Sequence, residues 1–165
     1  MEEMKITKSD LLNKTGSQIK ETIKMSDSER WKEEKQSKST LEIYNKFKAN
    51  ICDEHHLYDN TEDSIILYKT RSNTLPLNWR NRFKPGASEE DQICPLCNDG
   101  IESMEHFLLF CENQMAIRNK YETWITNSQD EKLMNILCFN GKLEGRKLLK
   151  ELWTARRRKT ENAAS

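Results

Sequence analysis

The sequence has no long apolar run, and this absence excludes two classes of protein. No stretch of its 165 residues approaches the roughly 18 consecutive apolar residues that a membrane-spanning helix requires. The amino-terminal segment MEEMKITKSD also lacks the apolar core of a secretory signal peptide. We therefore expect a soluble protein with no membrane partner, located inside the cell in the nucleus or the cytoplasm.

Apolar residues are also scarce, at 35% of the chain against 33% for charged residues. This apolar share lies below the roughly 45–50% of an ordinary globular domain. The core should therefore be small and should benefit from an additional stabilising cross-link, such as a bound metal ion. The five cysteines are an odd number, and no secretory signal accompanies them. In a reducing compartment, closely spaced cysteines favour metal binding over disulfide formation.

The chain also has no net charge, since its 27 basic residues balance 27 acidic ones. A neutral chain gives no global reason to expect a polyanionic partner. The charges are unevenly distributed, however. Residues 68–84 hold five basic residues and no acid, whereas residues 86–115 hold seven acids and no Lys or Arg. A phosphate-binding surface is therefore expected on residues 68–84 rather than on residues 86–115.

The apolar residues recur at intervals of three and four, which predicts a mostly α fold with little or no sheet. Residues 1–38 are polar, and we expect a weak helix or a solvated arm there. A better pattern begins with Thr40 as a candidate N-cap. The residues that then share one helical face are Leu41, Tyr44, Phe47 and Ile51.

Further helices are expected in the second half of the chain, over 64–71 and from about Ser103 to Tyr121. The amphipathic spacing of Leu148, Leu149, Leu152 and Trp153 predicts a closing helix with a frayed, basic end. These patterns divide the chain into a polar arm (1–38), a helical segment with a zinc knuckle (39–125) and a carboxyl-terminal amphipathic helix with a basic tail (126–165).

The most informative pattern is C-x2-C-x8-H-x4-C, formed by Cys94, Cys97, His106 and Cys111. Three thiolates and one imidazole are a usual tetrahedral set for Zn²⁺, and the two-residue gap allows both cysteines of a turn to face one ion. Because all four positions are filled by protein, the zinc would be structural rather than catalytic. The alternative is that Cys94 and Cys97 are surface thiols and that His106 is a packed helix residue.

Here the sequence resembles a known family. The run ICPLCNDGIESMEHFLLFC, followed by Arg118 and Tyr121, is similar to the carboxyl-terminal CCHC zinc region of reverse transcriptases from non-LTR (LINE-like) retrotransposons. Upstream, WKEEKQSKSTLEIYNKFK and LYKTRSNTLPLNWRNRF resemble the stretch that precedes that zinc region. The resemblance implies a zinc module that helps to hold RNA or target DNA. The aspartate pair of a polymerase palm and an endonuclease-like segment are both missing from this sequence.

The acids around the knuckle would repel phosphate, so we place nucleic-acid contact on residues 69–84. Aromatic residues lie among the basic ones there, which offers phosphate contacts and stacking surfaces together. The alternative is a solvated basic face with Trp79 in the core. The candidate binding residues are Lys69, Arg71, Trp79, Arg80, Arg82 and Lys84.

Two other clusters are weaker candidates. The run from Arg156 to Lys159 could bind phosphate or direct nuclear import, although such runs are more often solvated tails. Cys52, His55 and His56 have the composition of a metal site but no fourth partner nearby.

The sequence thus favours a nucleic-acid-binding accessory module with one zinc ion. The alternative is a zinc-stabilised protein-interaction module that docks a protein partner through the helices at 41–51 and 148–153. An enzyme is the least favoured hypothesis. No catalytic Ser/His/Asp or Cys/His pair remains once the cysteines and His106 bind metal.

Overall fold

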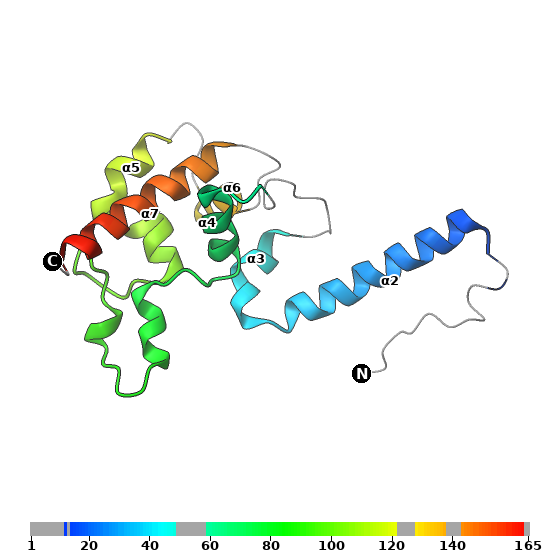
Figure 1. Cartoon of the computed structure of the whole chain (residues 1–165), viewed down its shortest axis with the longest axis horizontal. Coiled ribbons are helices and arrows are strands. Elements are labelled where there is room, and N and C mark those ends of the chain that lie inside the picture. Colours follow the sequence, from blue (N-terminus) through cyan, green and yellow to red (C-terminus); the bar gives the residue numbers. More distant parts are fainter. Residues whose placement is uncertain (1–11, 13, 49–58, 122–127, 138–142, 164–165) are drawn as a thin grey trace. The chain divides into compact units, whose positions relative to one another are not determined.

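The computed structural model describes residues 12, 14–48, 59–121, 128–137 and 143–163 (Figure 1). The chain divides into two compact units, Met1–Asp53 and Glu54–Ser165. The described residues are mostly helical and contain no β-strand, only an isolated bridge between Ile93 and Ile101. The predicted mostly α fold class is therefore confirmed. The division at 38/39 and 125/126 was drawn on composition and stays a prediction.

The first unit is built around one long helix, α2 (Gly16–Gln36). Thr15 begins it with a capping box: the Thr15 hydroxyl accepts from the Gln18 amide, and the Gln18 side chain accepts from the Thr15 amide at 2.8 Å. Such reciprocal bonds satisfy two donors that a helix start otherwise leaves free. The side chains of α2 are mostly exposed, with Lys35 as its buried residue, so α2 is a solvated helix.

The next helix of this unit begins later than the sequence predicts. Thr40 lies inside a 3₁₀ helix, Ser39–Leu41, and α3 (Glu42–Phe47) begins after it without a side-chain cap. An N-cap residue needs a non-helical backbone, and Thr40 is already part of a helical turn. The expected N-cap is therefore wrong. Ile51, the last residue of the predicted apolar face, lies outside the described residues.

The second unit contains α4 (Glu62–Arg71), α5 (Met115–Asn119), α6 (Gln129–Leu137) and α7 (Leu143–Ala163). Short 3₁₀ helices span Asn78–Phe83, Glu90–Gln92 and Glu112–Gln114, and one π-helical turn spans His106–Phe110. The expected helix at 64–71 is confirmed by α4. None of the described helices combines the length and the apolar character that a membrane-spanning segment needs.

Helix α7 organises the core of the second unit, since α4, α5 and α6 all pack against it (Figure 1). Leu148, Leu149 and Leu152 of α7 are completely buried, as their amphipathic spacing predicts. Burying one such side chain stabilises a fold by about 1.5–3 kcal/mol. The buried apolar residues of α4, α6 and the π turn, which also contacts α7, are Ile66, Leu67, Phe107, Leu108, Leu133, Ile136 and Leu137.

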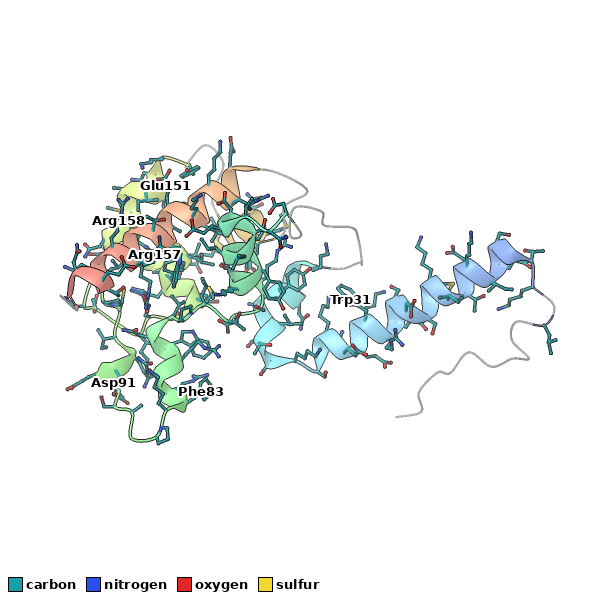
Figure 2. All side chains as sticks on the ribbon, viewed as in Figure 1. Trp31, Phe83, Asp91, Glu151, Arg157 and Arg158 are labelled. Atoms are coloured by element: carbon teal, nitrogen blue, oxygen red, sulfur yellow. The ribbon has the colours of Figure 1, made fainter. Side chains whose placement is uncertain are left out.

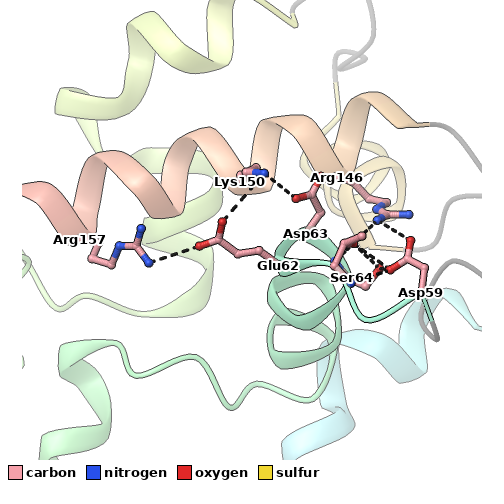
Figure 3. A network of polar contacts seen from close by, with 8 residues as sticks. Asp59, Glu62, Asp63, Ser64, Arg146, Lys150 and Arg157 are labelled. Atoms are coloured by element: carbon pink, nitrogen blue, oxygen red, sulfur yellow. Dashed lines mark hydrogen bonds and ion pairs between the residues drawn. The ribbon is translucent and has the colours of Figure 1, made fainter.

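Ion pairs join the start of α4 to the exposed side of α7 (Figure 3). The Arg146 guanidinium lies 2.9 Å from Asp59, and the Lys150 ammonium lies 2.9 Å from Asp63. Hydrogen bonds from Ser64 and Thr61, together with Arg146, hold the pKa of the Asp59 carboxyl well below its usual range. The basic face of α7 is therefore partly neutralised by α4.

Two sequence-based expectations about helix ends are wrong. The helix predicted from Ser103 to Tyr121 is interrupted at Cys111, whose ψ of 114° is not helical. The basic end of α7 is not frayed, because α7 continues to Ala163 and buries Arg156 within it. A buried ion pair holds Arg156 in place, and sequence periodicity carries no signal for such a pair.

Candidate functional site

The structure brings Cys94, Cys97, His106 and Cys111 together, with all four ligand atoms within 4.8 Å of one another. The Sγ atoms of Cys94 and Cys111 lie 3.8 Å apart, and Cys97 Sγ lies 3.3 Å from His106 Nε2. A tetrahedron with Zn–S bonds of about 2.3 Å and a Zn–N bond of about 2.0 Å has edges of about 3.8 and 3.5 Å. These two separations therefore match the edges of a tetrahedral site, and the cluster is compact enough to hold one metal ion.

A tight turn places the first two ligands. The Cys94 carbonyl accepts from the Asn98 amide at 2.9 Å, and the Cys94 amide donates to the Gly100 carbonyl at 3.0 Å. Asn98 and Gly100 have φ values of 56° and 70°, a backbone region that asparagine and glycine tolerate best. This turn directs the Cys94 and Cys97 side chains toward the same point, as the C-x2-C spacing predicts.

The π-helical turn places the other two ligands. In an α-helix, residues five apart point about 140° away from each other, because each residue rotates the helix by about 100°. The Cys111 amide instead donates to the His106 carbonyl at 2.8 Å, which is the i to i+5 bond of a π turn. This wider turn brings His106 and Cys111 to the same side. The π turn and the clustering of the four residues therefore occur together.

Burial shifts the protonation equilibria of three residues in the cluster. Burial raises the pKa of the Cys94 thiol and, with the neighbouring Cys94 sulfur, raises that of Cys111 to about 12. Burial lowers the pKa of His106, so its imidazole is neutral at pH 7 and able to ligate. Thiolates in this buried site need a compensating positive charge, which a divalent metal ion supplies. The four residues could therefore bind a metal ion.

Arg118 is a second cation near the cluster that sequence reasoning did not assign a role. Its Nη2 donates to the Cys111 carbonyl at 2.6 Å, and its Nη1 is buried without a hydrogen-bond partner. Burial lowers the pKa of Arg118, and the Cys111 sulfur opposes this shift. Three thiolates on a divalent ion have a formal charge of about −1, which a nearby guanidinium offsets.

Glu102 lies between the two pairs of ligands in sequence and is completely buried. It forms a two-point ion pair with Arg156 of α7: Nε donates to Oε1 at 2.6 Å, and Nη2 donates to Oε2 at 2.8 Å. Such paired bonds are the strong geometry for an arginine and a carboxylate. Glu102 therefore adds no exposed negative charge, which corrects the expectation that every acid near the knuckle repels phosphate.

The predicted nucleic-acid-binding residues divide into two groups. Arg71 is buried, and its Nε donates to the Leu137 carbonyl, so its position is that of a packing residue. Lys69 is exposed on α4. The other four residues, Trp79, Arg80, Arg82 and Lys84, lie in or next to the 3₁₀ helix Asn78–Phe83. We call residues 78–84 the basic segment.

In the basic segment, the Arg82 guanidinium stacks on two rings, 4.5 Å from the Trp79 centroid and 4.7 Å from the Phe83 centroid. Phe83 is 67% exposed (Figure 2), and the next residue, Lys84, is exposed as well. Trp79 is only partly buried, so it is not the core residue of the alternative interpretation. Arg80 is less available, because its Nη1 donates to the Asn73 carbonyl at 2.8 Å.

The run from Arg156 to Lys159 is not a continuous basic patch. Arg156 is buried against Glu102, and Arg157 pairs with Glu62 at 3.3 Å and Glu161 at 3.7 Å. Arg158 and Lys159 are exposed. The weaker candidate metal cluster of Cys52, His55 and His56 lies outside the described residues.

Comparisons of this chain with protein-family models, with curated proteins and with solved structures found no match. The functional argument therefore rests on the geometry of the cysteine and histidine cluster and of the basic segment.

Proposed function

We propose that this protein is a nucleic-acid-binding accessory module stabilised by one structural zinc ion. Cys94, Cys97, His106 and Cys111 would bind the zinc, and the basic segment would contact RNA or DNA. The module would have no polymerase or endonuclease site and no other catalytic activity, in keeping with its resemblance to the carboxyl-terminal CCHC region of non-LTR retrotransposon reverse transcriptases. We propose a nuclear or cytoplasmic location on the same grounds.

The choice of zinc follows from the ligand chemistry. Three soft thiolates and one imidazole in a tetrahedral arrangement suit Zn²⁺ better than Mg²⁺ or Ca²⁺, which prefer oxygen ligands. Four protein ligands leave no open position for a catalytic water or a substrate. The zinc would therefore act by holding residues 94–111, which we call the metal loop, in its folded form.

The observation that supports nucleic-acid binding is the stack of Arg82 on Trp79 and Phe83. An exposed ring next to exposed cations can stack on a base while the cations neutralise the neighbouring phosphates. A duplex hides the faces of its bases, and a six-residue 3₁₀ helix is too short to act as a major-groove recognition helix. These features favour a single strand over a duplex.

Titration at several salt concentrations tests this proposal. Fluorescence anisotropy with labelled oligo-U, oligo-dT and a matched duplex would compare the parent with the double variant Arg82→Ala/Lys84→Ala. Each phosphate contact to a single strand contributes about 0.7 to the slope of log K against log salt. The double variant should lose about 1.4 from this slope and bind more weakly.

A matched control is Arg158→Ala/Lys159→Ala, which removes the same charge from exposed positions on α7. This control should bind like the parent. The proposal is wrong if the parent does not bind any of the three probes at low salt. The assignment of nucleic-acid contact to the basic segment is wrong if the control variant loses affinity and the basic-segment variant keeps it.

The alternative function, a protein-interaction module, loses one of its two expected docking helices. Leu148, Leu149 and Leu152 are buried within the second unit, so they are not available to a partner. Salt-independent binding to a protein would be the result that favours this alternative.

A further inference from the structure

The basic segment is attached by hydrogen bonds to the chain that leads into the first metal ligand. Asn78 Nδ2 donates to the Ile93 carbonyl at 2.7 Å, and Ile93 directly precedes Cys94. Asn81 Nδ2 donates to the Asp91 carbonyl at 2.6 Å. Two asparagine side chains of the basic segment are thus bonded to backbone within three residues of a ligand.

The metal loop also reaches back to the basic segment through Glu102. Glu102 Oε2 accepts from the Asn78 amide at 2.6 Å, at the first residue of the 3₁₀ helix. Arg156 completes the arrangement, since its Nη2 lies 3.3 Å from Asn78 Oδ1 while it also binds Glu102. A carboxylate of the metal loop is therefore a direct partner of the backbone that presents Trp79 and Arg82.

These partners keep their positions only while the metal loop is folded. The Glu102 amide donates to the Gln92 carbonyl at 2.9 Å, so residues 92–93, just before Cys94, lie beside residues 101–102 of the metal loop. In small zinc units the energy of metal binding is the energy of folding. Without a metal ion, the buried sulfur atoms of Cys94 and Cys111 have no shared cation, and the metal loop loses the metal–ligand bonds that would hold it folded.

We propose that metal occupancy controls the nucleic-acid affinity of this protein indirectly, by ordering the basic segment through Asn78, Asn81 and Glu102. The metal ligands themselves do not contact nucleic acid in this scheme, in agreement with the exposed acids Asp99, Glu105 and Glu112 beside them. The control of affinity rests on the function proposed above. The ordering of residues 78–84 by metal does not depend on it.

Amide hydrogen exchange followed by mass spectrometry measures the ordering without nucleic acid. In the parent, zinc removal with a chelator should raise exchange in the metal loop and, by about tenfold or more, in residues 78–84. The α4 and α7 peptides should keep their protection. Equal exchange of residues 78–84 with and without zinc, or equal loss of protection in α4 and α7, would each overturn the proposal.

A double variant separates metal binding from its effect on residues 78–84. Asn78→Ala/Asn81→Ala removes both side-chain links and keeps the four ligands, so the zinc content should remain near one per chain. Residues 78–84 of this zinc-loaded variant should already exchange rapidly, and its affinity for oligo-U should fall about tenfold. The matched control is Asn113→Ala, because the exposed Asn113 side chain also donates to a backbone carbonyl of the metal loop, that of Leu96, but lies outside the basic segment.

The two proposals fail in different ways. If the Asn78→Ala/Asn81→Ala variant keeps parental exchange in residues 78–84, the coupling is refuted even if the parent binds oligo-U. If the parent shows metal-dependent exchange in these residues but does not bind oligo-U or oligo-dT, the proposed function is refuted and the coupling stands. If Asn113→Ala exposes residues 78–84 as much as the double variant does, the link through Asn78 and Asn81 is wrong.

Discussion

The ion pair between Arg156 and Glu102 provides the sharpest test of how the second unit is held together. Arg156 is 6% exposed and Glu102 is 0% exposed, so neither charge is solvated. Replacing Arg156 with Met keeps most of the side-chain volume and removes the guanidinium. The Glu102 carboxylate then keeps the Asn78 amide, 2.6 Å away, as a hydrogen-bond donor but has lost the guanidinium.

Removing one partner of a buried ion pair costs about 3–5 kcal/mol, because the remaining charge stays buried without compensation. For a chain of this size, 1 kcal/mol corresponds to a change in Tm of about 2–4 °C. Arg156→Met should therefore lower the Tm by about 6–20 °C. Thermal or urea unfolding, followed by far-ultraviolet circular dichroism at saturating zinc, would measure this change.

A double-mutant cycle would assign the loss to the pair itself. Arg156→Met/Glu102→Gln removes both charges, and it should be less destabilised than the sum of the two single variants, by about 2 kcal/mol or more. The neighbouring variant Arg157→Met is the control. The Arg157 and Glu62 side chains are 48% and 46% exposed, and such surface pairs contribute only about 0–1 kcal/mol.

The reasoning is refuted if Arg156→Met costs no more free energy of unfolding than Arg157→Met. It is also refuted if the cycle shows additive effects, because additivity would mean that Arg156 stabilises the protein independently of Glu102.

Three further predictions concern the metal site. Elemental analysis should find about one zinc per chain, and parent protein that is metal-free after purification without chelator would contradict this. The variant Cys97→Ser should lose the zinc and unfold at least residues 94–121, as judged by hydrogen exchange. The raised pKa values of Cys94 and Cys111 mean that zinc displaces their protons, so log affinity should rise by about two or more per unit of pH between pH 6 and 8, and a flat profile would refute thiolate ligation. Arg118→Met should weaken zinc affinity about 10–100-fold in a competition titration, whereas the exposed Lys120→Met should not; equal affinities would exclude a counter-charge role for Arg118.

The sequence alone was enough for the features that depend on short-range spacing. The C-x2-C-x8-H-x4-C pattern identified all four clustered residues, because two ligands from one turn and two from one helical segment are fixed largely by local backbone geometry. The apolar periodicity likewise predicted α4 and the buried face of α7, since a helix places residues three and four apart on one side.

The interruption at Cys111 shows where local reasoning was insufficient. Residues 103–121 have the apolar pattern of one helix, but His106 and Cys111 face the same point, and the π turn followed by a non-helical ψ achieves this. The backbone that brings these two residues together therefore departs from the one that helix propensity predicts. The C-x2-C-x8-H-x4-C spacing contained this signal, because residues five apart do not share a face of an α-helix.

What only the tertiary structure decided is which charged residues are exposed. Arg71, Arg82 and Arg156 look alike in the sequence, yet Arg71 donates to Leu137, 66 positions away, and Arg156 pairs with Glu102, 54 positions away, while Arg82 remains exposed on two aromatic rings. Spacing along a chain determines which residues share a face of one element. It contains no information about which distant carbonyl or carboxylate will cover a guanidinium, because that depends on how the elements pack.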